Sequence, residues 1–242
     1  QRTAAVSVRN VTKRFGPVLA NDKVCLDIYR GEILALLGEN GSGKTTLMNM
    51  LSGIYYPDEG EIYINGKPVS ISSPKESFHL GIGMIHQHFK LVDVFTAAEN
   101  IILGLDEKLD MKSAIRKIRK ICDQYGFDID PNQKIYDMSV SQKQTIEIIK
   151  VLYRGADILI LDEPTRGIDV GAKYDIYCLI NKMVEDGKSV IMISSEMPEL
   201  LGMCDRIYVM SEGRLAGEFT AEEATQERIC LLYTSPSPRD CS

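Results

Sequence analysis

The sequence predicts an α/β fold built on a largely parallel sheet. From residue 158 onward, short apolar strands alternate with helical segments, which is the pattern of parallel sheets. A glycine-rich loop at 38–45 stands between an apolar strand and a helix, and residues 4–37 carry the turn and strand signals of an antiparallel layer. With 242 residues and 44% hydrophobic content, the chain can bury a sizeable core.

The first part of the chain is expected to form antiparallel strands that lead into one buried strand. Strand-like runs at 5–8 and 24–28 flank a turn at Gly16-Pro17, and the apolar run 32–37 follows Arg30-Gly31. Residues 60–67 predict a hairpin, because Asn65-Gly66 supplies the positive φ that both central turn positions require. This hairpin should extend the antiparallel layer.

The sequence changes to helical periodicity over residues 96–152. Apolar positions at Ile115, Ile118, Ile121, Cys122 and Tyr125 fall on one side of a helix. The opposite side is basic and holds Arg116, Lys117, Arg119 and Lys120. That face could dock a partner, although a solvated helix face is the commoner meaning of such a charge run.

The last part of the chain should alternate strands and helices and then end irregularly. We expect strands at 158–161, 189–193 and 206–210, helices at 170–186 and near 197–203, and a final hairpin through Glu212-Gly213. Residues 230–242 show no strand or helical period and contain two Ser-Pro pairs. They resemble a translated sequencing adapter, so we treat them as a non-native tail outside the fold.

Composition and charge exclude several classes of protein. The net charge of −6 arises from 34 acidic and 28 basic residues spread along the chain, which argues against a nucleic-acid partner. No apolar run approaches the ~18 residues of a membrane span, and no secretory leader is recognisable. The six cysteines contain no CxxC pair, which suits buried thiols in a reducing compartment better than a metal or disulfide framework.

The glycine-rich loop carries the clearest chemical signal. Residues 38–45 fit the pattern GxxxxGK[ST], in which small residues let backbone N–H groups surround phosphate oxygens at a helix N-terminus. Lys44 should neutralise the β- and γ-phosphates, and the Thr45 hydroxyl should bind Mg²⁺. The alternative, a glycine-rich turn without function, does not explain the order of strand, loop and helix. The expected ATP-binding residues here are Gly38, Glu39, Asn40, Gly41, Ser42, Gly43, Lys44, Thr45 and Thr46.

Two adjacent carboxylates end the predicted strand 158–161. Asp162 and Glu163 would be costly there unless a cation or substrate lies opposite them. Asp162 fits a partner of Mg²⁺, and Glu163 can act as the general base that polarises water for attack on the γ-phosphorus. A simple helix-capping acidic pair is the alternative interpretation.

These residues resemble the nucleotide-binding subunits of ABC transporters over nearly all of 4–229. The phosphate loop, Gln87, the segment 139–142, Asp162-Glu163-Pro164-Thr165 and Asp169 occur in the family's order and spacing. The sequence is most similar to importers of simple sugars and nucleosides, whose ATPase subunit carries two cassettes in tandem. The resemblance implies a P-loop NTPase with a RecA-like core and antiparallel β subdomain at 4–85 and 153–229, and a helical subdomain at 86–152.

The resemblance also assigns roles to single residues. Phe15 matches the aromatic that stacks on adenine, although a plain core aromatic is the alternative. Gln87 matches the glutamine that contacts Mg²⁺ and the attacking water and communicates with the membrane subunits. Its neighbours His86 and His88 have the spacing of a metal pair, but no third ligand is evident. Asp169 matches the loop that crosses between two cassettes.

Two positions depart from the family pattern. The signature Leu-Ser-Gly-Gly-Gln, which closes over the ATP of the opposite cassette, is here Met138, Ser139, Val140, Ser141, Gln142. Replacing both glycines adds side chains where the backbone must approach phosphate, so the contribution to a partner site should weaken. Ser195 occupies the position of the family's switch histidine and cannot supply its imidazole, so hydrolysis in an isolated site should be slow.

These departures suggest that the chain combines two cassettes. Up to about Thr165 it resembles the first cassette of a tandem importer, whereas 166–173 and 194–199 resemble the second. We therefore hypothesise a mosaic joined at or near 161–165. Long-read sequencing of the source DNA tests this, because an uninterrupted gene through the junction would exclude an assembly error.

The sequence thus predicts an ATP-binding subunit that uses Mg²⁺ and ATP to drive import of a simple sugar or nucleoside. The resemblance implies a second cassette, membrane permease subunits and, indirectly, a solute-binding protein as partners, with a cytoplasmic location at the inner face of the membrane. The alternative is a degenerate cassette that binds nucleotide and dimerises but hardly hydrolyses it. A cassette of DNA repair or translation is disfavoured, because the chain lacks a basic groove and long inserts.

Overall fold

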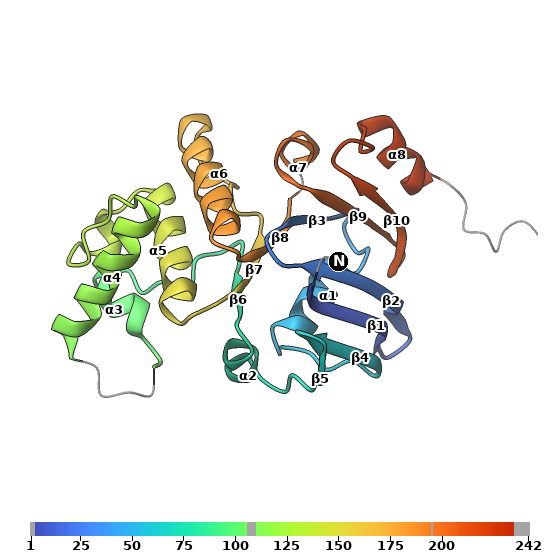
Figure 1. Ribbon diagram of the computed structural model, residues 1–242, viewed down its shortest axis with the longest axis horizontal. Coiled ribbons are helices and arrows are strands. Elements are labelled where there is room, and N and C mark those ends of the chain that lie inside the picture. The colour runs from blue at the N-terminus through green and yellow to red at the C-terminus, as the bar shows by residue number, and fades with distance from the viewer. Residues whose placement is uncertain (1–2, 106–109, 195, 235–242) are drawn as a thin grey trace, which may run out of the picture.

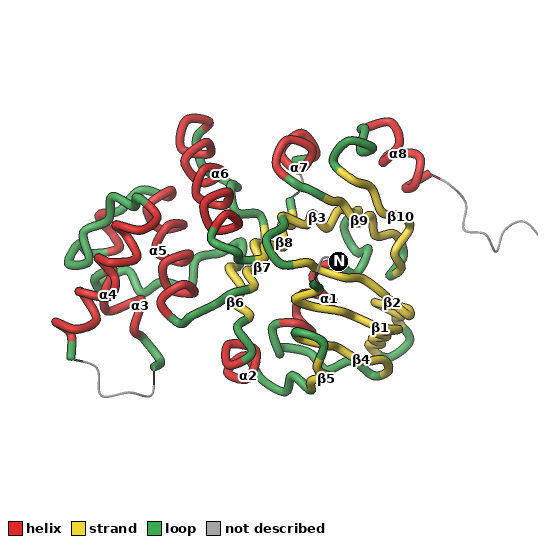
Figure 2. Tube along the Cα trace, viewed as in Figure 1, coloured by secondary structure: helices red, strands yellow, loops and turns green. Residues whose placement is uncertain are grey.

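The computed structural model describes residues 3–105, 110–194 and 196–234. Two sheets share the chain, and Figure 1 shows the six-stranded sheet lying between a group of helices at one end and a four-stranded sheet at the other. Figure 2, coloured by secondary structure, shows the same division into a helical end and a strand-rich end. The expected α/β fold is confirmed.

The six-stranded sheet has the order β10-β9-β3-β8-β7-β6. Its bounds are β3 (Ile33–Gly38), β6 (Ile82–Ile85), β7 (Ile158–Asp162), β8 (Ser189–Ile193), β9 (Arg206–Ser211) and β10 (Arg214–Thr220). All neighbouring strands from β9 to β6 are parallel, and β10 pairs antiparallel with β9. The carboxyl ends of five strands therefore meet at one edge, where parallel α/β sheets bind ligands.

The four-stranded sheet is antiparallel and has the order β2-β1-β4-β5. It comprises β1 (Ala4–Phe15), β2 (Val18–Tyr29), β4 (Glu59–Ile64) and β5 (Lys67–Val69). Asn65 and Gly66 between β4 and β5 have φ of 51° and 75°, as the predicted hairpin turn requires. In β1, Val6, Val8 and Val11 are buried, and the pairing with β2 shifts register between Val8 and Val11.

The two faces of the six-stranded sheet are covered differently. On β3, Leu34 and Leu36 join a core with α1 (Lys44–Leu51) and the antiparallel sheet. The alternate residues Ile33, Ala35 and Leu37 face a second core, which α5 (Val140–Tyr153), α6 (Val170–Glu185), α7 (Met197–Met203) and α8 (Gln226–Thr234) complete. This two-residue period explains why buried strands on both faces read as continuous apolar runs.

A third core belongs to the helical end of the molecule. It joins α3 (Ala97–Ile102), α4 (Met111–Tyr125), the short 3₁₀ turn Ile135–Asp137 and α5. Buried Ile118 and Cys122 lie on the apolar side of α4, whereas Arg116, Lys117, Arg119 and Lys120 are exposed. The predicted two-sided helix is confirmed.

Three elements differ from expectation or were not expected. Helix α8 extends to Thr234, and Leu232 packs against the core beneath it, so the prediction that no helical period continues beyond 230 was wrong for 230–234. The rest of the predicted tail lies outside the described residues. Neither α2 (Pro74–His79) nor β6 was predicted. Strand β6 has only four residues, with Gly81 directly before it and Gly83 within it.

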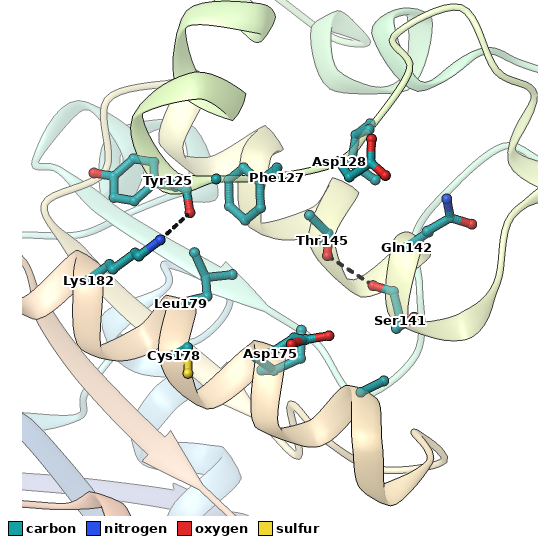
Figure 3. A pocket seen from close by; sticks show the side chains of 14 residues that line it. Tyr125, Phe127, Asp128, Ser141, Gln142, Thr145, Asp175, Cys178, Leu179 and Lys182 are labelled. Atoms are coloured by element: carbon teal, nitrogen blue, oxygen red, sulfur yellow. Dashed lines mark hydrogen bonds between the residues drawn. The ribbon is translucent and has the colours of Figure 1, made fainter.

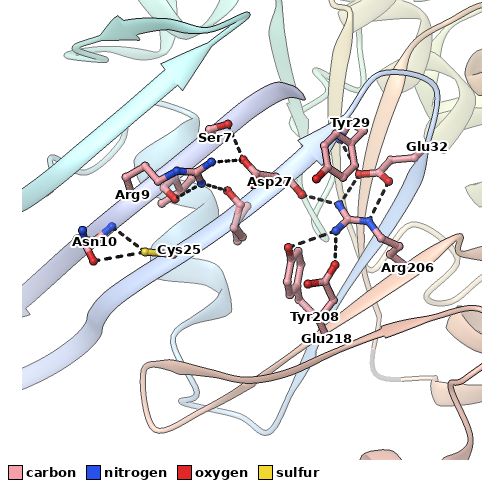
Figure 4. A network of polar contacts seen from close by, with 12 residues as sticks. Ser7, Arg9, Asn10, Cys25, Asp27, Tyr29, Glu32, Arg206, Tyr208 and Glu218 are labelled. Atoms are coloured by element: carbon pink, nitrogen blue, oxygen red, sulfur yellow. Dashed lines mark hydrogen bonds and ion pairs between the residues drawn. The ribbon is translucent and has the colours of Figure 1, made fainter. Parts of the chain in front are cut away.

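A buried ion pair joins β9 to the turn between β2 and β3 (Figure 4). The Arg206 guanidinium contacts Glu32 Oε1 at 2.8 Å and donates from Nε to Oε2 at 3.1 Å. It lies 4.6 Å from the ring centroid of Tyr29 and 5.2 Å from that of Tyr208, and it also pairs with Glu218. Arg206 therefore connects β9 of one sheet with Tyr29 of β2 in the other and with the turn that follows β2.

Within the described residues, no helix combines the length and the apolarity needed to span a membrane.

Candidate nucleotide-binding site

The predicted site residues come from loops at the carboxyl edge of the parallel sheet. The phosphate loop follows β3, Asp162 ends β7, and Gln87 lies two residues beyond β6. Strand β8 lies between β3 and β7 in the sheet, so its following residue, Ser194, emerges between the phosphate loop and Asp162. The topology thus brings residues that are more than a hundred positions apart to one edge.

The phosphate loop adopts a conformation that requires glycine. Gly41 and Gly43 have φ of 85° and 97°, and α1 begins directly afterwards at Lys44. A Cβ on Gly43 would lie 2.4 Å from the Ala20 carbonyl oxygen, and one on Gly38 would lie 2.5 Å from the Met210 oxygen. The backbone is therefore packed closely on both sides, which leaves its N–H groups at the N-terminus of α1 as an anion cradle.

Two residues that the sequence did not single out support this loop. Asn21 is fully buried and donates from Nδ2 to the Gly43 oxygen at 3.2 Å. Gly213, in the turn between β9 and β10, donates its N–H to the Ser42 oxygen at 3.1 Å. Asn21 carried one available signal, a polar residue inside a predicted strand region, but nothing in the sequence indicated its partner.

Lys44 lies among the loop's own carbonyls and close to two carboxylates. Its Nζ donates to the Gly38 oxygen at 2.6 Å and to the Glu39 oxygen at 2.9 Å. Burial lowers the pKa of Lys44, while the charges of Glu163 and Asp162 act in the opposite direction. Burial likewise raises the pKa of Asp162, and Lys44 opposes that shift. One cation and two anions therefore share a half-buried edge, as expected where charged phosphates and a metal bind.

Glu163 occupies an unusual backbone conformation for a residue other than glycine. Its φ is 52°, and its N–H donates to the Ile193 oxygen of β8 at 2.8 Å. The Arg166 N–H closes the following turn by donating to the Glu163 oxygen at 3.2 Å. Such strain persists only where the surroundings hold it, and it is common at functional positions.

Gln87 reaches this turn from the neighbouring strand. In the amide orientation that satisfies both groups, the Gln87 oxygen accepts from Arg166 Nε at 3.3 Å and also from Nη1. Strands β6 and β7 pair with Ile85 opposite Leu161, which places Gln87 beside the residues that follow Asp162. Arg166 was not predicted as a site residue, because no nearby residue in the sequence indicates its partner.

Phe15 lies at the end of the β1–β2 hairpin that contacts the phosphate loop through Ala20 and Asn21. Its ring is 42% exposed and meets Tyr55 edge-on, with centroids 5.1 Å apart. The Lys13 ammonium lies 5.5 Å from the Phe15 centroid. A partly exposed ring on this hairpin is available for stacking, and its role in binding adenine stays a prediction.

The signature residues lie at the start of α5, away from the phosphate loop. Ser139 caps the helix, its Oγ accepting from the Gln142 N–H at 3.2 Å while Gln142 Oε1 accepts from the Ser139 N–H at 3.0 Å. Among the described residues, no hydrogen bond or ion pair joins them to 38–45. Val140 is 43% exposed, and Asp169 is an exposed N-cap of α6. Both segments therefore face outward from the chain.

A cavity of about 390 Å³ separates the start of α5 from α6 (Figure 3). Ser141, Gln142 and Thr145 line one side, and Asp175, Leu179 and Lys182 line the other. Lys182 Nζ donates to the Tyr125 oxygen at 3.2 Å across one end of the cavity. No phosphate-loop residue lines this cavity, so it is separate from the nucleotide edge.

The residues at the sheet edge fit Mg²⁺ by their chemistry. Thr45 is exposed on the first turn of α1, and Asp162 and Gln87 supply further oxygens, the donor type that Mg²⁺ prefers. Among the described residues, no group of three or more His, Cys, Asp or Glu side chains could hold a metal ion. Burial is the larger cause that lowers the pKa of His86, and the positive charge of Lys90 lowers it further. Ser195, the predicted switch position, lies outside the described residues.

The fold and this edge define a P-loop nucleotide-binding protein, in which a strand, a glycine-rich loop and a helix form the phosphate site. The sequence model of the ABC transporter family matches residues 21–166. The chain belongs to the ABC transporter family.

Individual relatives agree with this assignment. The nucleoside import ATP-binding protein NupA of Lactococcus lactis is 44% identical over 236 residues, covering 96% of this chain and 47% of the relative. The guanosine import ATP-binding protein NupO of Bacillus subtilis is 44% identical over 231 residues, covering 94% and 45%. An ATP-binding cassette of an ABC transporter in its ADP conformation superimposes with a TM-score of 0.83 and 25% identity over 96% of each chain. The chain spans about half the length of the curated relatives it matches.

Proposed function

We propose that this chain binds and hydrolyses ATP to drive import of a nucleoside or simple sugar. The observation that carries the proposal is the phosphate loop. The negative charges of Glu163 and Asp162 act to raise the pKa of its Lys44, against the larger effect of burial. The names of the two relatives, for nucleoside and guanosine import, support the choice of solute class. Solute recognition itself belongs to other subunits.

Each residue has a role that follows from its position. The N–H groups at the start of α1 and the Lys44 ammonium bind the β- and γ-phosphates, and Phe15 stacks on the adenine. Glu163, held by the Ile193 carbonyl, accepts the proton of the attacking water while Gln87 orients it. Thr45, Asp162 and Gln87 would hold Mg²⁺, which when bound neutralises charge on the transferred phosphoryl group.

A second cassette would complete the site. Ser139, Val140, Ser141 and Gln142 lie exposed or half-exposed at a helix N-terminus, remote from the chain's own phosphate loop. A helix N-terminus favours anions, so this segment suits the γ-phosphate bound by a partner. The relatives' doubled length agrees with two cassettes in one protein. Asp169, at the start of α6, would contact the partner at the same interface.

A membrane permease would dock beside Gln87. A groove of about 300 Å³ opens there, lined by Phe78, His86, Leu103, Lys150 and Arg154 among others. Because His86 directly precedes Gln87, a segment seated in this groove would act on the loop that faces the γ-phosphate. Under this proposal the chain would work at the inner face of the membrane, and a solute-binding protein would act indirectly through the permease.

Nucleotide titration of the 242-residue chain tests the site. Lys44→Ala should abolish ATP binding. Among the described residues, Lys44 is the only residue of the phosphate loop 38–45 with a cationic side chain. Lys120→Ala, which removes an exposed cation from α4, is the matched control. Unchanged ATP affinity in Lys44→Ala would refute the assignment.

The altered signature favours a second candidate, a cassette that binds ATP and dimerises but turns over slowly. Val140 places a branched side chain at the first position of α5, where glycine would let phosphate approach. Steady-state ATPase activity measured beside ATP binding distinguishes the two functions. Ser195→His should raise turnover if the chain is a hydrolysing subunit and should change it little if the chain is a nucleotide-sensing module.

A further inference from the structure

A buried carboxylate connects the two loops on either side of the catalytic edge. Glu199, on α7, is 7% exposed. Its Oε1 accepts from Thr165 Oγ1 at 2.5 Å, and its Oε2 accepts from Ser194 Oγ at 2.5 Å. Thr165 and Ser194 are themselves 2% and 3% exposed, so neither hydroxyl can exchange its bond for water.

Thr165 belongs to the turn that carries Glu163. The turn is closed by the bond from Arg166 N–H to the Glu163 oxygen, and Ile168 N–H donates to the Thr165 oxygen at 3.2 Å. Arg166 in turn contacts Gln87. The bond from the Thr165 side chain to Glu199 therefore adds a second restraint on the turn of Glu163, besides the bond of Glu163 N–H to β8.

Ser194 performs the same function for the loop after β8. Its Oγ donates to Glu199 and also accepts from the Glu196 N–H at 3.0 Å. The Glu196 carboxylate pairs with Lys173 Nζ of α6 at 2.6 Å. The two oxygens of one carboxylate thus set the distance between the turn that carries Glu163 and the loop that begins at Ser194.

Tyr177 of α6 is a third group at this carboxylate. Burial raises the pKa of Tyr177 to about 12, and its hydrogen bond to Glu199 contributes to the shift. Glu199 therefore faces hydroxyl groups from the loop after β7, the loop after β8 and α6. A carboxylate with several buried donors and a fixed position is well suited to orient neighbours, because the loss of one acceptor leaves a donor unsatisfied.

We propose that Glu199 is a positioning residue for ATP hydrolysis, which fixes the turn of Glu163 relative to the loop that follows β8. The proposal rests on the function proposed above, but its structural part can be measured without turnover. Glu199 is not expected to touch the nucleotide. It acts through Thr165 and Ser194, so its loss should affect the catalytic step more than ATP binding.

Hydrogen–deuterium exchange on the full chain provides the first test. Glu199→Ala should raise exchange roughly tenfold at the N–H groups of Arg166, Ile168 and Glu196, as expected for the loss of one buried hydrogen bond at each loop. Glu199→Gln keeps one oxygen that accepts a hydrogen bond and replaces the other with an NH₂ group that can donate to a hydroxyl oxygen. It should therefore change exchange by less than about threefold. Exchange unchanged in Glu199→Ala, or raised equally throughout the chain, would overturn the proposal.

Two further variants separate the loops and guard against misfolding of Glu199→Ala. Thr165→Val should raise exchange at Arg166 and Ile168 but not at Glu196. Glu32→Gln removes a charge from another buried glutamate and should lower stability without changing exchange in either loop. If Thr165→Val affects all three amides alike, Glu199 does not hold the loops independently and the proposal fails.

ATPase kinetics provide the second test. Glu199→Ala should lower kcat about tenfold with KM for ATP changed less than about twofold, and Glu199→Gln should restore most of the rate. A rise in KM for ATP with a matching loss of ATP affinity would indicate a merely structural role and would overturn the positioning role. If the unmodified chain binds ATP without turnover, the proposed hydrolytic function fails, and the exchange measurements still decide whether Glu199 positions the two loops.

Discussion

The glycines of the phosphate loop allow a quantitative prediction about stability. Gly41 and Gly43 both have positive φ, so alanine at either position should cost about 1–2 kcal/mol of backbone strain. Their surroundings differ. A Cβ on Gly41 meets nothing within 4 Å, whereas one on Gly43 would lie 2.4 Å from the Ala20 oxygen and 2.7 Å from Asn21 Nδ2. Overpacking of this kind adds about 1–3 kcal/mol.

Gly43→Ala should therefore lower the free energy of unfolding by about 2–5 kcal/mol and Gly41→Ala by about 1–2 kcal/mol. Urea titration followed by circular dichroism measures both, with equal m-values as the check that only stability has changed. Gly43→Ala should also displace the start of α1 from β2 and weaken ATP binding. Equal losses of stability in the two variants would refute the argument that backbone contact with Ala20, rather than φ alone, requires glycine at position 43.

Two other predictions concern buried charges. Burial raises the pKa of Asp162, so the folded chain retains that proton to higher pH than the unfolded chain, and stability from this group increases as pH falls through the raised pKa. Asp162→Asn should remove this increase in urea titrations that run upward from about pH 4, the ordinary pKa of Asp, and it should weaken Mg²⁺-dependent ATP binding; an unchanged pH profile would contradict it. Glu32→Gln should cost about 1–3 kcal/mol by weakening the pair with Arg206, without changing ATP affinity, which thermal unfolding and nucleotide titration together check.

The sequence predicted those parts of the fold in which local pattern and tertiary structure agree. The phosphate loop combines an apolar strand, glycines with positive φ and a helix start, all within adjacent residues. The hairpin at Asn65-Gly66 and the two-sided helix α4 are likewise local patterns. Asp162 and Glu163 were identified because two carboxylates at the end of a buried strand need a partner.

The remaining features depend on residues that are distant in the sequence. Nothing near Asn21 indicates that it donates to Gly43, and nothing near Arg206 indicates that it pairs with Glu32 across 174 positions. Strand β6 was missed because four residues flanked by glycine are too few for a periodic signal. Helix α8 (Gln226–Thr234) was not predicted at all, because Leu232 is stabilised by contact with the core rather than by helical periodicity.

The arrangement of the catalytic edge explains why such distant contacts matter for function. Glu163 cannot be fixed by its own strand, because β7 ends at Asp162 and the next residue takes a left-handed conformation. Three groups compensate: the Ile193 carbonyl holds its N–H, Arg166 closes its turn, and Glu199 holds Thr165. Since Ile193 ends β8 and Ser194 follows it directly, we expect movement of that segment to move Glu163. Any change that nucleotide or a partner cassette imposes on the loop after β8 would therefore reach Glu163, the proposed general base, through two hydrogen bonds and one buried carboxylate.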